Sequence, residues 1–431
     1  MAAGRRPSML SRAMSTPPAT PTIDLGTELK EPRELHNSVL TPPTSPRQSR
    51  SSSNISELAT PMSSPYLFSP HPLPNSKDVK VDPIKTDIMH QKHLTEANVA
   101  ECPFAIEVLK DDQGRDAVFG IGAWSTVFRA ATHTSSRTVS TSLTPPLSPT
   151  LITPVIVAVK KPARPDALAI LKSEAKVLSY LRNFPDSEKF VVPFYGVLDE
   201  ATIILGAIPV SLEDHIRACA VTAQQNFSTW TMTEPVLGST AKWFHLAQQL
   251  ISALAWLHDE ARVVHGDIKP GNILLSRVRG SGNGMTFEPV YADFSSSQRL
   301  DLEETTPNTL SAVTREYTAP ELLSSMVLRN PASTATTASD VFSMALTLLV
   351  AATGQLLVYS GSVFQRQAMA TQGWMVLSHV RNGEGGTRVP RFGTVERVLE
   401  RAVLKADMGR VSAQQWLSII EGIAQGEPAK I

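Results

Sequence analysis

Two kinds of hydrophobic pattern follow one another along this chain, and their order limits the folds open to it. Short apolar runs bounded by Gly or Pro occupy residues 116–131, 155–161, 190–197 and 201–208. Runs of this kind are typical of β-strands that end at turns. Residues 167–182 interrupt them with helical periodicity, because Leu168, Leu171, Ala175 and Leu178 fall on one side. The first half of the folded region is therefore expected to be rich in strands.

Helical patterns dominate after residue 210. They include residues 211–220, 241–261 and 340–354, and the last of these is almost wholly apolar. Residues 344–361 resemble a membrane span, but Gly354 and Gln355 break the run, which favours a buried core helix. We predict an α+β fold with a strand-rich N-terminal lobe, a larger helical C-terminal lobe and a ligand cleft between them.

Two segments rich in Ser, Thr and Pro differ from this pattern. Residues 1–100 and an insertion at about 131–154 are poor in aromatic residues, so they cannot bury enough apolar surface to offset their ordering entropy. We expect both to be disordered and residues 101–425 to form the folded domain. The pattern L-T-P-P-x-S-P occurs once in each segment, at residues 40–46 and 143–149.

The composition excludes several classes of partner and site. Lys plus Arg and Asp plus Glu are balanced at 40 each, so no net field attracts nucleic acid or an anionic membrane. With only Cys102 and Cys219, a disulfide framework or a cysteine-rich metal site is not expected. This cysteine usage fits a reducing compartment, and we expect the cytoplasm, the nucleus or both.

The polar stretch HGDIKPGNILL, residues 265–275, carries the strongest chemical signal. Asp267 can accept a hydroxyl proton, Lys269 can neutralise a phosphoryl group, and Asn272 can ligate a metal ion. A tight loop before a strand would present all three to the cleft. By itself the stretch also fits a plain polar turn between two apolar segments.

The stretch resembles the catalytic loop H-R-D-x-x-x-x-N of eukaryotic protein kinases. Residues 119–127, FGIGAWSTV, are similar to the family's Gly-rich loop, with Ser125 at the third glycine. Gly120 and Gly122 lack side chains, so backbone N–H groups there can approach phosphates. Further motifs follow in the family's order between about residues 104 and 420. We identify this region as a member of the family, which implies the bilobal protein-kinase fold with ATP in the cleft.

The resemblance implies a role for each charged residue around a site for ATP and Mg²⁺. Lys160 corresponds to the lysine that holds the nucleotide phosphates, and Glu174 to its ion-pair partner. Asn272 and Asp293 correspond to the metal ligands. Asp267, Lys269 and also Lys160 are the expected catalytic residues. The other expected positions are Val127, Ala158 and Leu274 around adenine, the stacked Leu178, His265 and Phe294, and the structural Asp340, Glu321 and Arg410.

Two residues depart from the family pattern. Gly266 replaces an arginine that in many kinases grips a phosphate on the activation loop, so this switch is not expected here. Ser295 replaces the glycine of D-F-G; at positive φ it would cost roughly 1–2 kcal/mol and restrict movement of the segment. Insertions at 131–154 and 277–287 are expected to lengthen turns.

We expect a serine/threonine protein kinase, because Lys269 and Thr314 fit the Ser/Thr pattern of the family. A pseudokinase that acts as a nucleotide-binding scaffold is the alternative from another class, motivated by Gly266 and Ser295. A small-molecule kinase is a third reading, disfavoured by the A-P-E segment and the long activation loop. The subfamily is not placed, although the Pro-rich decoration has a fungal character.

The repeated L-T-P-P-x-S-P pattern predicts regulatory partners besides protein substrates. It pairs Thr41 with Ser45 and Thr144 with Ser148, each a proline-directed site. The pattern resembles doubly phosphorylated degrons, which implies upstream proline-directed kinases, a WD-repeat F-box ubiquitin ligase and a short-lived protein. Ordinary phosphorylation of a disordered chain is the other reading of the same residues.

Overall fold

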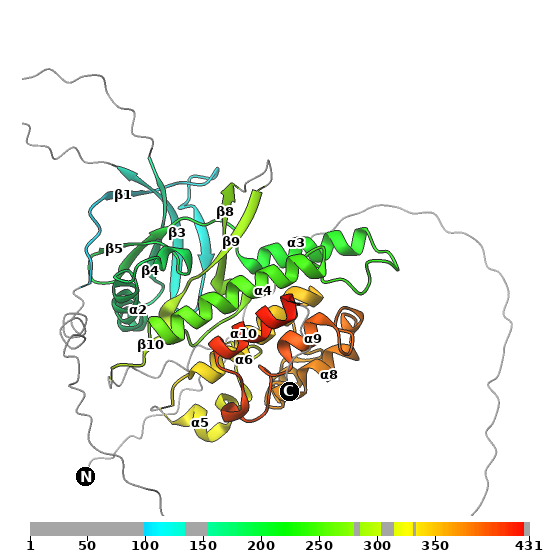
Figure 1. Cartoon of the computed structure of the whole chain (residues 1–431). Coiled ribbons are helices and arrows are strands. Elements are labelled where there is room, and N and C mark those ends of the chain that lie inside the picture. Colours follow the sequence, from blue (N-terminus) through cyan, green and yellow to red (C-terminus); the bar gives the residue numbers. More distant parts are fainter. Residues whose placement is uncertain (1–98, 134–153, 280–284, 303–313, 331–332, 426–431) are drawn as a thin grey trace, which may run out of the picture. The chain divides into compact units, whose positions relative to one another are not determined.

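A six-stranded antiparallel sheet forms the first half of the folded region (Figure 1). The computed structural model describes residues 99–133, 154–279, 285–302, 314–330 and 333–425. The strand order is β1-β3-β4-β6-β5, and β2 pairs with β3. All four predicted strand regions are confirmed, and β1 is an additional strand. The bounds are β1 Ala105–Val108, β2 Val118–Ile121, β3 Ser125–His133, β4 Ile156–Pro162, β5 Phe194–Leu198 and β6 Thr202–Gly206.

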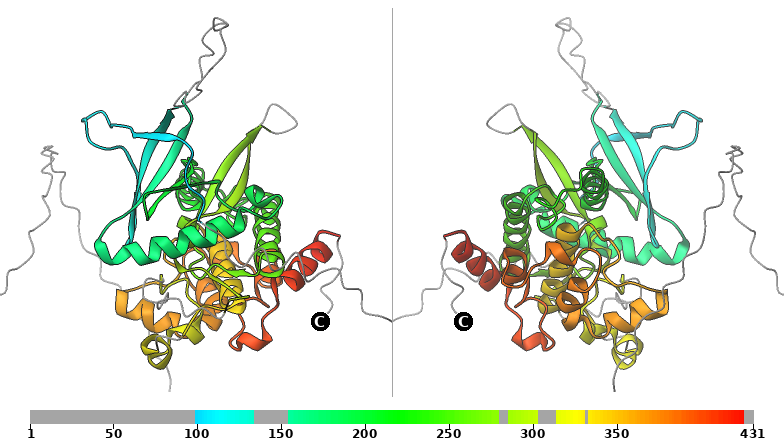
Figure 2. Two further views of the ribbon diagram at one scale, coloured as in Figure 1. Left: turned by 90° about the vertical axis from the view of Figure 1, so that its left-hand side faces the viewer. Right: turned by 90° about the vertical axis from the view of Figure 1, so that its right-hand side faces the viewer.

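Helix α2, Leu168–Leu181, lies between the sheet and the helical lobe (Figure 2). Its buried residues include Leu171, Ala175 and Leu178, which are at most 1% exposed, as the apolar spacing predicts. Glu174 is equally buried on this helix. Since an unpaired buried carboxylate is costly, its burial requires a partner on the sheet.

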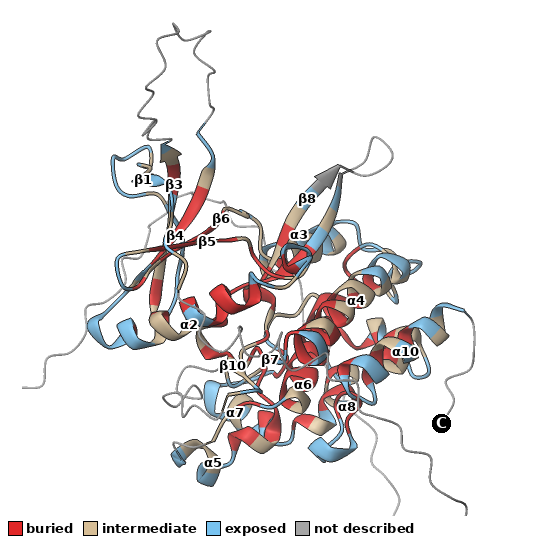
Figure 3. Ribbon diagram, turned by 60° about the vertical axis from the view of Figure 1, so that its left-hand side comes forward, coloured by how far each residue is buried: buried red, intermediate tan, exposed pale blue. Residues whose placement is uncertain are grey.

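The helical lobe is built around α6, whose residues from Ser339 to Thr353 are all buried (Figure 3). Thr336 caps its N-terminus, and Gly354 at φ +78° ends it, as expected for a core helix. No helix in the described part of the chain is long and apolar enough to cross a membrane. The lobe contains α3 Leu212–Gln225, α4 Thr240–Ala255, α5 Ser325–Arg329, α6 Thr337–Thr353, α7 Val363–Ala370, α8 Val376–Arg381, α9 Thr394–Leu399 and α10 Ala413–Ala424.

Two small sheets position the polar loops below the cleft. Strand β7, Val263–Val264, pairs with β10, Gln298–Arg299, and β8, Ile273–Arg279, pairs with β9, Met285–Tyr291. Residues 265–272 connect β7 to β8, and residues 292–297 connect β9 to β10, so each loop is anchored by a paired strand at both ends. This fixes the two loops beside each other.

The two insertions that are expected to lengthen turns contain strand residues at their edges. Residues 277–279 and 285–287 belong to the β8–β9 hairpin, where Arg277 pairs with Phe287. Residues 131–133 continue β3, and Ala131 pairs with Ile156 of β4. Ala100 also bonds to the sheet, through its carbonyl to Val197 N. Backbone pairing extends the strands beyond the apolar runs that predict them. The disorder predicted for the rest of 1–100 and 131–154 lies outside the described residues.

Candidate active site

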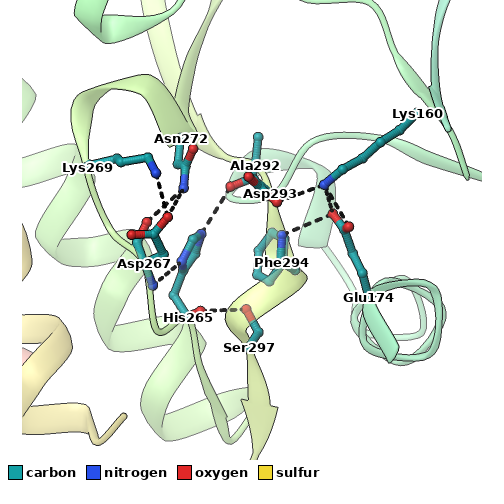
Figure 4. A network of polar contacts seen from close by, with 10 residues as sticks. All are labelled: Lys160, Glu174, His265, Asp267, Lys269, Asn272, Ala292, Asp293, Phe294 and Ser297. Carbon is teal, nitrogen blue, oxygen red and sulfur yellow. Dashed lines mark hydrogen bonds and ion pairs between the residues drawn. The ribbon is translucent and has the colours of Figure 1, made fainter. Parts of the chain in front are cut away.

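The loop between β7 and β8 brings two of the three predicted catalytic residues, Asp267 and Lys269, together with Asn272 (Figure 4). Lys269 Nζ lies 2.6 Å from Asp267 Oδ2 and 2.8 Å from Thr314 Oγ1. Asn272 Nδ2 donates to the Asp267 carbonyl at 2.8 Å and to Asp267 Oδ2 at 3.2 Å. Thr314 N also donates to Asp267 Oδ1 at 3.3 Å. Asp267 is therefore held by three neighbours, and its carboxylate is 10% exposed.

Lys160 joins the sheet, helix α2 and the segment after β9 in one charged cluster. Its Nζ lies 2.7 Å from both carboxylate oxygens of Glu174 and 2.7 Å from Asp293 Oδ1. Glu174 Oε1 also accepts from Phe294 N at 3.2 Å. The side chains of Lys160 and Glu174 are almost fully buried, whereas that of Asp293 is 39% exposed to the cleft. Asp293 is thus the most exposed member of the cluster, and both Asp293 and Lys160 line the cleft.

Opposing effects set the charges of this cluster. Desolvation disfavours the Lys160 ammonium, but Asp293 and Glu174 outweigh it and raise the pKa of Lys160. Desolvation likewise opposes ionisation of Asp293, yet Lys160 and a hydrogen bond from Ser295 lower the pKa of Asp293 below its usual range. Burial raises the pKa of Glu174, against the opposite effect of Lys160. Lys160 is therefore a cation and Asp293 an anion at neutral pH.

A cleft of about 320 Å³ opens above the cluster, within the size range of small-ligand sites. Of the predicted binding residues, Gly120, Gly122, Val127, Ala158, Lys160, Leu274, Asn272 and Asp293 line it. Glu174 lies behind Lys160 and does not line the cleft. Asp267 and Lys269 also lie outside the lining. Asp267 bonds to Asn272, which does line the cleft, and Lys269 bonds to Asp267. The predicted set is thus one continuous site with a lined cavity and a polar loop next to it.

The Gly-rich strand-turn-strand forms the roof of the cleft. Gly122 N donates to Ser125 O at 2.8 Å, which closes the turn between β2 and β3. A Cβ at Gly120 would meet no atom within 4 Å, so the backbone there is open to a ligand. Ile121 at the tip is 80% exposed. This geometry suits a flap that covers phosphates with backbone N–H groups.

The metal expected from the resemblance fits the donor atoms at the cleft. Asn272 uses its amide nitrogen toward Asp267, and its side-chain carbonyl oxygen accepts no hydrogen bond from the described residues. Asp293 Oδ1 accepts from Lys160, and its carboxylate, which is 39% exposed, lines the cleft. Two oxygen donors suit Mg²⁺, which usually takes one or two carboxylates and fills its shell with water and phosphate. Within the described ranges, no cluster of three or more His, Cys, Asp or Glu residues offers a dedicated metal cage.

Gly266 is a tightly packed glycine, a constraint that the sequence does not reveal. Its φ is +83°, and a Cβ added there would lie 2.3 Å from the Ser296 carbonyl oxygen. Its N–H donates to Asp340 Oδ1 at 2.9 Å, and His265 N donates to Asp340 Oδ2 at 2.7 Å. The absent side chain therefore lets two loops touch, in addition to removing an arginine.

The strain expected at Ser295 is absent. Ser295 is not among the described residues with positive φ; it lies within a short 3₁₀ turn, Phe294–Ser296. Asp293 takes the left-handed conformation instead, at φ 60° and ψ 74°. Aspartate tolerates this region better than most residues because its short polar side chain bonds locally. The serine is accommodated because the left-handed residue comes two positions earlier.

A buried stack connects the two loops. The rings of His265 and Phe294 are 4.9 Å apart, and both residues are at most 1% exposed. His265 Nε2 donates to Ala292 O at 3.1 Å, and Nδ1 accepts from Asp267 N at 3.3 Å. Burial lowers the pKa of His265, although the nearby carboxylates of Asp340, Asp267 and Asp293 oppose this. A neutral imidazole satisfies both bonds.

The expected structural pair between the A-P-E segment and the C-terminal part is present. Arg410 donates to Glu321 Oε1 at 2.6 Å and to Oε2 at 2.7 Å, a bidentate pair. The Arg410 guanidinium also lies 5.0 Å from the centroid of the Phe342 ring on α6. Glu321 is thereby fixed to the core of the helical lobe.

Several contacts at the site were missed by sequence reasoning. Ser211 and Asp214 line the outer edge of the cleft, and Ser297 Oγ donates to the His265 carbonyl at 2.7 Å. The S-x-x-D pattern at Ser211 signals a helix N-cap, which could have placed Asp214 at that edge. No sequence pattern distinguishes Ser297 from its serine neighbours.

Known proteins match the part of the chain that carries this geometry. A model of the protein kinase domain matches residues 155–419. The human serine/threonine-protein kinase/endoribonuclease IRE2 is 33% identical over 135 residues, 31% of this chain and 14% of that protein. Mitogen-activated protein kinase kinase 1 of Arabidopsis thaliana is 30% identical over 110 residues, 26% of this chain and 27% of that protein. The chain thus spans less than a third of either relative.

The matched region begins after the Gly-rich residues and includes every charged residue of the site. Lys160, Glu174, Asp267 and Asp293 all fall within it, on the sheet, helix and loops described above. The α+β fold of a strand-rich lobe and a helical lobe is the one that this match implies. Since the match also covers well over half of the chain, the chain belongs to the protein kinase family.

Proposed function

We propose that the chain is an active serine/threonine protein kinase that transfers the γ-phosphate of ATP to protein hydroxyls. The observation that supports this most is the convergence of Asp267, Lys269, Asn272 and Asp293 at one end of a cleft whose Lys160 is paired with Glu174. Phosphoryl transfer depends on positioning and charge stabilisation. Each of these side chains is already held by at least one bond.

Asp267 orients the substrate hydroxyl and accepts its proton. Among the described residues, its Oδ1 accepts only from Thr314 N at 3.3 Å, a long bond that a substrate hydroxyl can replace. Lys269 bridges Asp267 and Thr314, and its ammonium is placed to offset charge that develops on the transferred phosphoryl group. Thr314 thereby links the catalytic loop to the segment on which a protein substrate would rest, which supports Ser/Thr specificity.

Lys160 couples nucleotide binding to metal binding. All three of its donors are used, two toward Glu174 and one toward Asp293. A phosphate that takes the third donor frees Asp293 Oδ1 for another partner. Mg²⁺, when bound by Asn272 and Asp293, would neutralise charge between the β- and γ-phosphates. ATP and metal should consequently bind with positive cooperativity.

The proposal is tested by phosphate transfer from ATP to casein or myelin basic protein by the purified full-length chain. Wild type should label serine and threonine, and Asp267→Asn should lower transfer to background. Nucleotide binding without transfer by wild type would support the pseudokinase alternative instead. Phosphate found on a metabolite and not on protein would favour a small-molecule kinase.

We also propose that activity does not require phosphorylation between Ser295 and residue 312. Gly266 supplies no guanidinium to bind such a phosphate. Replacing every Ser and Thr in that range by Ala should leave transfer within a few-fold of wild type. A decrease of about a hundredfold would show that another basic group has this role. Residues 303–313 lie outside the described part of the chain, so the proposal depends on Gly266.

Rapid turnover through the two L-T-P-P-x-S-P copies is a separate proposal. Both copies lie outside the described residues, and the repetition in the sequence is its only support. Each phosphate adds about −1.5 to −2 charges, which suits an Arg-lined F-box receptor after proline-directed kinases have acted. In a chase after blocking translation, Thr41→Ala with Thr144→Ala should lengthen the half-life. An unchanged half-life would reject the degron.

A cytoplasmic or nuclear location is proposed on the cysteines. Cys102 and Cys219 are both free thiols, as a reducing compartment allows. Fractionation of cells that express the tagged chain would test this, and recovery in the secretory pathway would contradict it.

A further inference from the structure

Helix α2 is bound to the helical lobe at a second point besides Glu174. Tyr180 lies six residues after Glu174 on the same helix, about 9 Å along its axis. Its hydroxyl donates to the Ala261 carbonyl at 3.0 Å, and the side chain is buried. A displacement of α2 would therefore break both the Glu174–Lys160 pair and the Tyr180 contact.

Arg299 covers the Tyr180 ring from the start of the activation segment, which we define as residues 293–321. The carbon at the centre of its guanidinium lies 3.6 Å from the ring centroid. This is a close cation–π stack, and the Arg299 side chain is only 8% exposed. Strand β10, which contains Arg299, is paired with β7 directly before the catalytic loop. The stack thus connects α2 to the strand that supports Asp267.

Asp301 occupies the edge of the same guanidinium. Arg299 Nε lies 3.0 Å from Asp301 Oδ1, and Nη2 lies 2.5 Å from Oδ2. A bidentate carboxylate fixes the plane of the guanidinium, which the stack on Tyr180 requires. Leu300 N also donates to the Arg262 carbonyl at 2.8 Å, which holds the turn between the two partners. Ring, cation and carboxylate therefore form one rigid unit.

We propose that Tyr180, Arg299 and Asp301 form a clamp that holds α2 in place and keeps Glu174 bonded to Lys160 without a phosphate on the activation segment. The carboxylate of Asp301 pairs with the Arg299 guanidinium from within the same segment. The effect on activity rests on the proposed kinase function. The effect on α2 does not, because it is a property of the folded chain alone.

Hydrogen exchange of the full-length chain tests the clamp directly. Arg299→Gln should speed exchange of the α2 amides, residues 168–181, about tenfold, while α6 amides stay as slow as in wild type. Asp301→Asn should give a smaller increase, and Asp301→Glu should restore most of the protection. Arg329→Gln at the exposed end of α5 is the matched control and should change neither helix. Unchanged α2 exchange in Arg299→Gln, or equal acceleration of α2 and α6, would overturn the clamp.

Transfer assays add a second arm with its own outcome. Arg299→Gln should lower kcat/KM for ATP about tenfold, mainly through KM, because a loosened α2 releases Lys160. Wild type treated with phosphatase should keep its activity. If phosphatase removes the activity, the clamp does not replace a phosphate. Arg262 would then be the next basic residue to test as the group that binds that phosphate. If wild type transfers nothing at all, the kinase proposal fails while the exchange result still decides the clamp.

Discussion

Two groups of contacts next to the cleft, a charged one and a largely uncharged one, are held together by different forces (Figure 4). In the first group, Lys160, Glu174 and Asp293 form a charged cluster with three bonds of 2.7 Å. In the second, Gly266 touches the Ser296 carbonyl, and Ser297 bonds to the carbonyl of His265. We call the second group, His265, Gly266, Ser296 and Ser297, the loop junction. It consists of backbone, hydroxyl and a neutral ring.

The difference separates what a ligand can rearrange from what it cannot. Phosphates and a metal ion can compete for the charged cluster, because its members exchange one charged partner for another. They cannot compete in this way for the loop junction, because its contacts are backbone packing and a hydroxyl–carbonyl hydrogen bond. The junction can thus keep Asp267 in place while Lys160 and Asp293 exchange partners.

The largest expected effect concerns the charged cluster. Asp293→Ala removes a proposed metal ligand and one of the two carboxylates that bind Lys160. We expect phosphate transfer to fall by about a thousandfold or more. Transfer rates at saturating ATP and protein substrate measure it, with Asp112→Ala, an exposed aspartate of the first lobe, as the control. Transfer within tenfold of wild type would contradict the role of Asp293.

The next effect concerns the loop junction, where restoring the arginine of the family motif should harm the protein. Gly266→Arg would complete the H-R-D motif, yet any Cβ at this φ approaches the Ser296 carbonyl to 2.3 Å. Left-handed backbone and overpacking together should cost about 3 kcal/mol, so both Gly266→Ala and Gly266→Arg should lower stability and transfer. Denaturant unfolding measures the loss. Gly422→Ala, where a Cβ meets nothing within 4 Å, should lose no stability; an equal loss there would show that the packing at Gly266 is unimportant.

A smaller effect depends on pH. Because burial lowers the pKa of His265 in the folded state, the unfolded chain binds more protons below the ordinary value of about 6.5. Stability from His265 is therefore present above that value and is lost as the pH falls. The free energy of unfolding should decrease by up to about 1.4 kcal/mol per pH unit between roughly pH 6.5 and 5. His265→Phe should have a shallower slope, and identical slopes would rule out His265 as the source.

The smallest effect is a single hydrogen bond. Ser297→Ala removes the 2.7 Å bond to the His265 carbonyl in a buried position and should cost about 1 kcal/mol with transfer nearly unchanged. Ser418→Ala on the exposed side of α10 should cost less, and this order is checked by thermal unfolding. Equal costs would show that the junction bond adds nothing beyond an exposed serine.

The charged cluster could be predicted from the sequence, and the loop junction could not. Lys160, Glu174, Asp267, Asn272 and Asp293 are residue types that phosphoryl transfer requires, in a recognisable order. In the sequence, Gly266 and Ser295 are only departures from the family pattern. The packing of the two loops decides which residues have positive φ. These are Gly266 in the catalytic loop and, after β9, Asp293 and not Ser295. Tertiary contacts between distant segments decide such details.

The same limit applies to the fold. Apolar periodicity predicts β4, α2 and α6, because their buried faces repeat in the sequence. Strand β1 is only four residues long, so the apolar spacing of Ile106 and Val108 does not stand out in the sequence, although both residues pack against the core of the sheet. The outer part of the β8–β9 hairpin is defined by backbone pairing, as between Arg277 and Phe287. The Arg299–Tyr180 stack joins residues more than a hundred positions apart, and no local pattern indicates it.

The central claim, that the assembled site transfers phosphate, is tested most directly by measuring ATP binding and single-turnover transfer on the same preparations. Wild type and Asp267→Asn should bind ATP with similar affinity in the presence of Mg²⁺, because Asp267 lies outside the cleft lining. Wild type should then transfer the γ-phosphate, and Asp267→Asn should be slower by at least about a hundredfold. Equal binding with no transfer by either protein would contradict the account and identify the chain as a nucleotide-binding scaffold.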